Sequence, residues 1–331
     1  MSMSTASPLE PSGDARIGDL SARVGRLMKS DQRSLTVIRA REFGIYAILI
    51  LCGLFSLLVT ASIIFVLLTE TLQFFRSDEV TLSNFLGSTK WNPLLGGEKS
   101  FGIWALVSGT MLVTVIAMVI ALPLGLVTAI YMSEYAPKKV RNILKPVLEV
   151  LAGVPTVVYG FFALMTITPI LQWLHRGFDV YNAMSAGIAV GILCLPTVCS
   201  LAEDALQAVP RSLREAAYGL GGTRFDVSVK VVLPAALSGI ISAFLLAIAR
   251  AVGETMIVAL AAGSLPQATI DPREQVQTMT GFMVQMASGD VSNYGTEYYS
   301  MYAVAFTLFV ITLVLTMIGN VVRKRFRETY E

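Results

Sequence analysis

Two opposite charges lie in the middle of a long apolar stretch of the sequence. Arg250 and Glu254 fall within residues 236–263, far from either flank. A charged residue at the centre of a membrane helix costs about 2.5–3.5 kcal/mol on insertion scales, so such residues usually face a water-filled cavity or a bundle interior. The guanidinium donors of arginine match the oxygens of a tetrahedral oxyanion two at a time. The pair therefore predicts a site on the route of an anion.

The same spacing also fits a structural ion pair. On a continuous helix, residues four apart share a face, which would bring Arg250 and Glu254 close enough to pair. Such a bridge within the helix, or one to a neighbouring subunit, would serve assembly alone. In the transport hypothesis, Glu254 holds Arg250 in place or competes with the anion for it. The sequence leaves both interpretations open.

A polar segment between two apolar stretches carries a spaced pattern of residues. The pattern consists of Glu215-Ala216-Ala217, Gly221, Val231 and Leu233-Pro234. Small side chains at Ala216 and Ala217 allow a short helix to lie close in a partner's groove, and Gly221 ends that helix without steric cost. Leu233-Pro234 then starts the next span. The pattern predicts a coupling helix, and an ordinary amphipathic connector is the alternative.

Other kinds of chemistry find no support in the residue types. The single His175 stands beside Arg176, and Cys52, Cys194 and Cys199 all fall in apolar stretches, where cysteine behaves as a small hydrophobe. These spacings indicate neither a metal site, nor a disulfide framework, nor a catalytic triad. The sequence also lacks a Gly-rich phosphate loop with a trailing Lys and Ser or Thr. We expect no catalytic residue and no cofactor in this chain; if ATP drives it, another subunit binds the ATP.

The composition indicates an all-α integral membrane protein. The chain has 331 residues, of which 54% are hydrophobic and 15% charged, and its mean hydropathy is +0.67. Few soluble domains have this composition. Six apolar stretches can each cross a hydrocarbon core that needs about 20 helical residues. They lie at 44–69, 105–132, 147–173, 183–205, 236–263 and 299–322.

The basic residues predict the orientation in the membrane, because cytoplasmic flanks collect Lys and Arg. Most of them fall before residue 44, at 138–145, within 206–235 and in the tail 323–331. We place these segments inside, which makes both termini cytoplasmic. The segments placed outside hold only Arg76, Lys90, Lys99, Arg176 and Arg273. The net charge of +2 gives no indication of nucleic-acid binding.

Three parts follow from this topology. Residues 1–43 are polar and form a cytoplasmic N-terminal tail, which is too long to be a typical cleaved signal peptide. The tail is compatible with a short amphipathic helix on the membrane surface or with a disordered segment. Residues 44–322 form the transmembrane domain, which includes the coupling segment 206–235. Residues 323–331 form a cytoplasmic C-terminal tail.

Several motifs resemble those of a known family. The pattern from Glu215 to Pro234 resembles the EAA loop of permease subunits in bacterial ABC importers. The run from Arg250 to Met256 is similar to the signature of phosphate-specific permeases of the PstC type. The sister PstA type usually has Ala-Pro after its Gly-Glu-Thr, where this sequence has Met256-Ile257. Trp91-Asn92-Pro93 and Tyr131 to Pro137 also resemble segments of the PstC type, and Leu151 to Gly160 resembles the third-span opening seen in both phosphate permeases.

The resemblance implies the type I ABC importer permease fold, with six transmembrane helices and a cytoplasmic EAA coupling helix. It implies import of inorganic phosphate across the bacterial cytoplasmic (inner) membrane by ATP-driven alternating access. The implied partners are a PstA-type permease subunit in a heterodimer, two PstB-type ATPase subunits that bind ATP and Mg, and a PstS-type phosphate-binding protein. The whole complex, and not this chain, would be the phosphate-transporting ATPase.

The same resemblance assigns roles to individual residues. It places Arg250, Glu254 and Thr255 on the substrate pathway. The contact with the ATPase is assigned to Glu215, Ala216, Ala217, Gly221, Leu233 and Pro234.

Three other functions remain as alternatives. The first is a permease for another oxyanion, such as molybdate or sulfate, which shares the EAA loop but not the run from Arg250 to Thr255. The second is a permease for amino acids or sugars, in which an intramembrane arginine would be unexpected. The third is a membrane scaffold or sensor whose coupling segment recruits a signalling partner. Co-purification of an ATPase separates this third alternative from the others.

Overall fold

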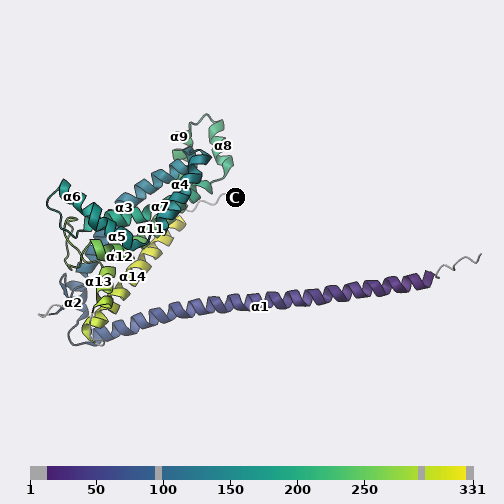
Figure 1. Cartoon of the computed structure of the whole chain (residues 1–331), viewed down its shortest axis with the longest axis horizontal. Helices are drawn as coiled ribbons and strands as arrows, with labels where there is room; N and C mark the ends of the chain where they lie inside the picture. The colour runs from purple at the N-terminus through teal and green to yellow at the C-terminus, as the bar shows by residue number, and fades with distance from the viewer. Residues whose placement is uncertain (1–12, 94–98, 290–294, 326–331) are drawn as a thin grey trace, which may run out of the picture. The chain divides into compact units, whose positions relative to one another are not determined.

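The computed structural model describes residues 13–93, 99–289 and 295–325, with side chains described from residue 41 onward. This described chain is almost entirely helical (Figure 1). Its strands are the short segments β1 (Trp91–Asn92) and β2 (Ser100–Phe101), which pair antiparallel. The all-α prediction is confirmed.

The helices follow one another along the chain with short connections. Those before residue 183 are α1 (Gly13–Arg76), α2 (Leu82–Gly87), α3 (Trp104–Ile130), the π-helical turn η1 (Tyr131–Tyr135), α4 (Lys138–Gly153), α5 (Thr156–Phe162), η2 (Ala163–Ile167) and α6 (Thr168–Leu174). The later ones are α7 (Ala183–Gln207), α8 (Arg211–Gly219), α9 (Arg224–Val227), η3 (Ser228–Val232), α10 (Leu233–Ala235), α11 (Leu237–Val252), α12 (Met256–Ala261), α13 (Met279–Ser288) and α14 (Thr296–Arg325).

Five segments of the described chain are long and apolar enough to cross a membrane. They are Arg41–Arg76, Trp104–Tyr135, Thr156–Leu174, Ala183–Gln207 and Thr296–Arg325. A sixth span results if Arg224–Ala235 and Leu237–Val252, which meet at an angle of 69°, are counted together. The chain is therefore a multi-pass membrane protein, with the six predicted spans when the bent pair is counted as one.

The third predicted span, 147–173, is not one helix. Helix α4 ends at Gly153, Val154 and Pro155 are extended, and α5 begins at Thr156. Proline disfavours the helical conformation of the residue before it and has no N–H to donate. The membrane-crossing part is therefore Thr156–Leu174, and α4 is a separate helix.

The fifth predicted span, 236–263, is interrupted as well. Helix α11 ends at Val252, and α12 begins only at Met256. Gly253 stands at the interruption, where its low helix propensity favours a break. The break lies within the Arg250 to Thr255 run, so the predicted site does not lie on one continuous helix.

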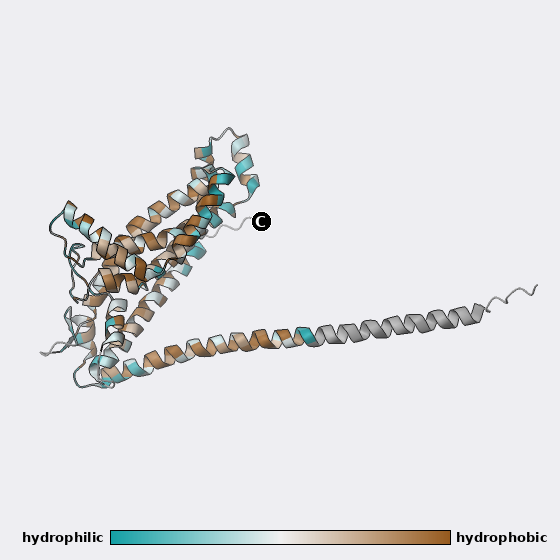
Figure 2. Cartoon of the chain, in the orientation of Figure 1, coloured by the Kyte–Doolittle hydropathy of each residue, from teal (hydrophilic) through white to brown (hydrophobic). Residues whose placement is uncertain are grey.

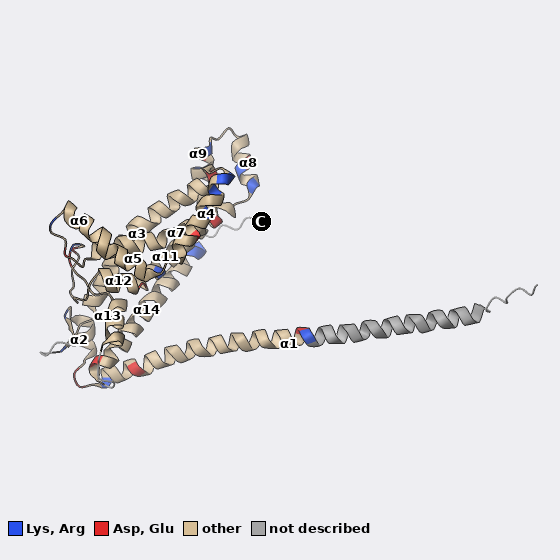
Figure 3. Ribbon diagram, viewed as in Figure 1, with Lys and Arg blue, Asp and Glu red and all other residues tan. Residues whose placement is uncertain are grey.

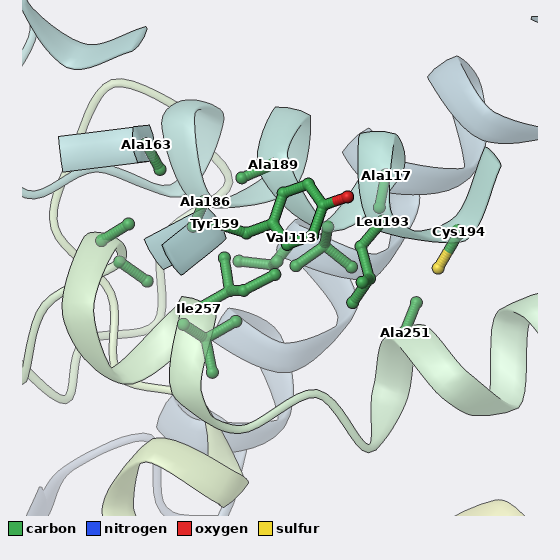
Figure 4. Packing of buried hydrophobic residues seen from close by; sticks show 14 of the residues in the cluster. Val113, Ala117, Tyr159, Ala163, Ala186, Ala189, Leu193, Cys194, Ala251 and Ile257 are labelled. Carbon is green, nitrogen blue, oxygen red and sulfur yellow. The ribbon is translucent and has the colours of Figure 1, made fainter. Parts of the chain in front are cut away.

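Helix α7 lies at the centre of the unit formed by residues 67–331, packed against α3, α11 and α12. Small residues permit this close packing: a Cβ added to Gly187 of α7 would lie 2.6 Å from Ile116 of α3. Figure 4 shows Leu193 and Cys194 of α7 facing this core, with Ala251 of α11 and Ile257 of α12 on either side of the break. The residues that flank the break are therefore part of this core.

A second, aromatic cluster fixes the end of this unit opposite the coupling segment. Its rings pack edge to face. Phe74 packs on Phe85 and Phe101, and Trp91 packs on Phe101 and on Phe282 of α13. Lys99 is tied to the same end, because its Nζ lies 2.8 Å from a carboxylate oxygen of Glu297 and 3.0 Å from one of Glu79. These hydrogen bonds raise the pKa of Lys99.

The residues up to Val66 form a unit of their own, within the long helix α1. Helix α1 begins at Gly13, so the predicted N-terminal tail is helical from that residue, and residues 1–12 lie outside the described range. Between residues 44 and 66 apolar residues run round the whole helix (Figure 2). A helix that is apolar on every side is typical of a membrane span.

Candidate functional site

Arg250 lies in the last turn of α11 and reaches across to α7. Its Nη1 donates a hydrogen bond to Thr197 Oγ1 at 3.0 Å, and the side chain is half-buried. A cation at the C-terminal end of a helix interacts favourably with the helix dipole. The guanidinium has five N–H donors, so the contact with Thr197 leaves most of them for other acceptors.

Glu254 does not share a helical face with Arg250, which corrects the prediction made from the spacing of four. It lies beyond the end of α11, and its backbone N–H donates to Ala251 O at 3.2 Å. Its carboxylate accepts from the backbone N–H of Ile257 at 3.4 Å, which caps the first turn of α12. Among the described residues, Arg250 and Glu254 form no ion pair within 4.0 Å.

The break is tied to α13 through Glu254. Thr280 Oγ1 donates to the backbone oxygen of Glu254 at 2.6 Å, and the Glu254 side chain is buried. Thr255 is half-buried, and its hydroxyl donates to Gly253 O at 3.2 Å. Glu254 and Thr255 therefore hold the broken backbone in shape, whereas Arg250 alone of the three extends a charge towards α7.

Helix α8 forms a protruding surface that is separate from this break. Glu215 and Ala216 are exposed, Ala217 is half-buried, and Glu215 makes no hydrogen bond or ion pair within the described chain. The apolar residue Leu220, just after the helix, is 91% exposed. The exposed side of α8 and the residue after it therefore make few contacts with the rest of the described chain.

Local backbone geometry explains why the EAA-like pattern has a glycine and a proline at these positions. Gly221 has φ +86°, a left-handed conformation that favours glycine and ends α8. Pro234 lies in the first turn of α10, where its missing N–H is not needed. Leu233 is half-buried. Leu233-Pro234 begins the short helix α10, and the longer helix α11 of this bent pair begins at Leu237, after the bend.

Residues 121–328 match the family described as the binding-protein-dependent transport system inner membrane component. The chain belongs to this family. It is 31% identical over 294 residues to the probable ABC transporter permease protein YqgH of Bacillus subtilis, covering 88% of this chain and 93% of that protein. It is also 31% identical over 256 residues to the phosphate transport system permease protein PstC of Mesorhizobium japonicum, covering 72% and 77%.

Solved structures of ABC importers share the fold. One chain of a bacterial alginate ABC transporter, crystallised with its alginate pentasaccharide-bound periplasmic protein, superposes with a TM-score of 0.63 at 14% identity. The match covers 88% of this chain and 97% of that one. The predicted importer permease fold is confirmed, and at this identity the likeness concerns the fold alone.

Within this family fold, the coupling segment is fastened to the bundle by an arginine that the sequence analysis did not single out. Arg214 of α8 donates to Leu206 O at 2.6 Å and to Val209 O at 2.7 Å, at the end of α7. Its Nη2 also lies 3.2 Å from Glu134 Oε1, in the turn that ends α3. Arg214 thus joins α8 to the ends of two spans. Arg214 directly precedes Glu215 of the EAA-like pattern, so its position could have identified it from the sequence.

A second missed residue is Glu203 of α7, whose side chain is fully buried. Its Oε1 accepts from Arg141 Nε at 2.7 Å and from Gln207 Nε2 at 2.7 Å. Glu203 falls inside the predicted span 183–205, so the rule that singled out Arg250 applies to it equally. The expectation that intramembrane charges mark function should therefore have included Glu203.

Among the described residues, no group of three or more His, Cys, Asp or Glu side chains is placed to hold a metal ion. Several charged residues gather at the end formed by α4, α8 and α9 (Figure 3). There Asp226 accepts from Lys230 Nζ at 2.6 Å, and the hydrogen bonds from Lys230 and Thr223 lower the pKa of Asp226 to about 2.

Proposed function

We propose that this chain is a permease subunit of a binding-protein-dependent ABC importer that moves inorganic phosphate across the cytoplasmic membrane. The observation that carries the proposal is Arg250, a half-buried guanidinium at the break, whose one hydrogen bond among the described residues is to Thr197. A tetrahedral oxyanion is the ligand that such a fork fits best. The name of the Mesorhizobium japonicum relative supports phosphate over molybdate or sulfate.

The proposed partners follow from the family fold and from the exposed coupling surface. A PstA-type permease subunit forms the heterodimer, a PstS-type protein delivers phosphate outside, and two PstB-type ATPase subunits bind ATP and Mg inside. One ATPase covers the side chains of Glu215 on α8 and of Leu220 just after it. No nucleic acid takes part. The chain itself has no catalytic role, and the complex is the ATPase.

The proposed orientation in the inner membrane follows from charge. Lys and Arg gather at the α4, α8 and α9 end, which becomes the cytoplasmic side. Both termini lie on that side.

The proposed mechanism is alternating access, in which ATP binding biases the permease towards one of two arrangements. Nucleotide shifts this equilibrium only if the ATPases bind one arrangement of the permease more tightly than the other. Arg214 provides the connection, because α8 is bonded through it to the ends of α7 and of the turn after α3. A movement of α8 is thereby passed to α7, whose Thr197 holds Arg250.

The test is phosphate uptake into proteoliposomes that contain the complete complex, with the loaded binding protein on one side and ATP on the other. Wild type is compared with Arg250→Gln, and Arg176→Gln in an exposed loop serves as the matched control. We expect ATP-dependent uptake in wild type and in the control, and none in Arg250→Gln with the complex still assembled. ATP-dependent uptake that is unaffected in Arg250→Gln removes Arg250 from the pathway.

The same preparation distinguishes the alternative functions. Uptake of molybdate or sulfate in place of phosphate by the wild type would show a permease for another oxyanion. Purification of the chain with a signalling protein and without an ATPase would show a scaffold or sensor.

A further inference from the structure

A cavity of about 300 Å³ opens beside the residue that holds Arg250. Helices α4, α7 and α11 form its walls. Its lining includes Lys145, Glu149, Thr197, Ser200, Glu203 and Leu246. Thr197 is the acceptor for Arg250 Nη1, so the cavity begins where the Arg250 side chain ends.

Three polar residues of α7 line this cavity in a row. Thr197, Ser200 and Glu203 are spaced by three, so they follow one another along one face of the helix. Six residues of helix span about 9 Å. The row leads from Arg250 towards the C-terminal end of α7, which is the end that precedes α8.

One buried acceptor in the cavity has no hydrogen-bond donor. Glu203 Oε1 is satisfied by Arg141 and Gln207, but Glu203 Oε2 is buried and has no hydrogen-bond partner among the described residues. Lys145 Nζ stands 3.9 Å from this oxygen, which is too long for a hydrogen bond. A buried carboxylate oxygen requires a donor, and an ionised carboxylate can only accept.

Lys145 is itself only loosely engaged. Besides the contact with Glu203, its Nζ lies 3.5 Å from Asp204 Oδ1. An ammonium has three donors, so Lys145 can turn towards an anion in the cavity. The hydroxyl of Ser200 makes no hydrogen bond within the described chain, and the hydroxyl of Thr197 can donate while it accepts from Arg250.

We propose that this cavity is a second anion site, and that it selects a tetrahedral oxyanion that carries a proton. The ligand's ionised oxygens accept from Lys145 and from the hydroxyls of Thr197 and Ser200, while its O–H donates to Glu203 Oε2. Hydrogen phosphate meets both requirements. Sulfate has no proton at neutral pH, so it offers Glu203 no donor and is repelled by the carboxylate charge.

The proposal rests on the proposed function, and it gives phosphate a station between Arg250 and the cytoplasmic end. Glu203 and Glu149 then have a role in this cavity. Their negative charges weaken the binding of an anion that carries no proton, and this favours release of that anion from the cavity. Specificity of this kind depends on a repulsive element as well as an attractive one.

The experiment measures equilibrium binding of radiolabelled inorganic phosphate and sulfate to the purified complete complex, without nucleotide and without the binding protein. The variants are Lys145→Gln and Glu203→Gln, with Lys139→Gln, an exposed cation on the same helix, as the matched control. We expect Lys145→Gln to weaken phosphate binding at least about tenfold and Lys139→Gln to leave it unchanged. Glu203→Gln should weaken phosphate binding and strengthen sulfate binding, which lowers the ratio of phosphate affinity to sulfate affinity.

Ser200→Leu provides a test that leaves every charge in place. The larger side chain fills the cavity, so phosphate binding should fall as it does in Lys145→Gln, even if Glu203→Gln does not assemble. Arsenate, which also carries a proton at neutral pH, should compete with phosphate in the wild type.

Phosphate binding in Lys145→Gln and Ser200→Leu with the affinity and selectivity of the wild type would overturn the second site. This failure is distinct from that of the proposed function, because ATP-dependent phosphate uptake by the wild type would persist. Absence of any ATP-dependent phosphate uptake by the wild type would instead remove the proposed function itself.

Discussion

The break between α11 and α12 and the coupling helix α8 are both marked by short sequence motifs, yet they are built in opposite ways. At the break, Glu254 is buried and its carboxylate and backbone oxygen are both bonded inside the chain. On α8, Glu215 has no partner within the described chain and Leu220 is 91% exposed. The polar groups of Glu254 are therefore satisfied inside the chain, whereas Glu215 and Leu220 are left uncovered by the described chain.

This difference separates two kinds of substitution. A change at Glu254 disturbs groups that are already satisfied, so we expect it to cost stability as well as function. A change at Glu215 of α8 breaks no hydrogen bond or ion pair within the described chain, so we expect it to leave the fold intact and to act on the proposed contact with the ATPase. Arg214 joins the two regions, because it lies on α8 but bonds to the ends of the spans.

After the loss of uptake expected in Arg250→Gln, the largest effect is expected at Arg214. Arg214→Gln removes charge-assisted hydrogen bonds that are each worth about 1.5–3 kcal/mol, and α8 is then held by packing alone. We expect ATP-driven uptake to fall by more than about tenfold, while ATP hydrolysis continues without transport. The measurement is the ratio of phosphate taken up to ATP hydrolysed in proteoliposomes.

Glu134→Gln is the matched control for this prediction. It removes one of the three acceptors of Arg214 and leaves the carbonyls of Leu206 and Val209. The loss of coupling should be clearly smaller than in Arg214→Gln. Equal losses in the two variants would show that the ion pair, and not the attachment to α7, transmits the movement.

The sequence predicted α8 better than it predicted the break. The Ala, Gly and Pro residues of the EAA-like pattern act through local backbone geometry, such as the left-handed conformation at Gly221, so a local pattern suffices. The positions of Arg250 and Glu254 depend on where the helix ends. The spacing of four implied a pair on a continuous helix, but α11 ends at Val252.

Contacts between distant segments explain the rest of what the sequence did not predict. Thr197 and Arg250 are 53 residues apart, and Thr280 bonds to Glu254 across 26 residues. No period or motif in one sequence places such pairs together. The apolar stretches were located correctly by hydropathy, but hydropathy does not register the break at Pro155, since the residues on both sides of it are apolar.

Glu215→Lys should have the next largest effect. Because Glu215 is exposed and has no hydrogen bond or ion pair among the described residues, reversing its charge should leave the melting temperature of the isolated subunit unchanged. We expect the rate of ATP hydrolysis in the presence of the loaded binding protein to fall about fivefold, which corresponds to about 1 kcal/mol of activation free energy. Lys139→Glu, an exposed charge reversal on α4 at a residue without a hydrogen bond or ion pair within the described chain, serves as the control. Unchanged stimulation in Glu215→Lys would remove Glu215 from the contact.

A smaller effect is expected at Glu254, whose variants test whether it acts at the break through its hydrogen bond or through its charge. The amide oxygen of Glu254→Gln can still accept from the Ile257 N–H, so uptake should fall by no more than about threefold. Glu254→Ala removes the cap, which typically costs about 1 kcal/mol, and should lower the melting temperature. A severe loss of uptake in Glu254→Gln with normal stability would show that the charge itself takes part in transport.

The smallest effect is expected at Asp226, in the exposed part of the coupling segment. The hydrogen bonds from Lys230 and Thr223 lower its pKa from 3.8 to about 2, so the folded state favours the ionised carboxylate. This contribution to stability is present above about pH 4 and is lost as the pH falls towards 2. An exposed pair of this kind is screened by salt. We therefore expect Asp226→Asn to lower the melting temperature slightly at neutral pH, and to lower it less in high salt. The carboxyl carbon of Asp226, followed by NMR, should titrate well below its usual range, and a midpoint near 3.8 would show that the bonds to Lys230 and Thr223 are not formed in solution.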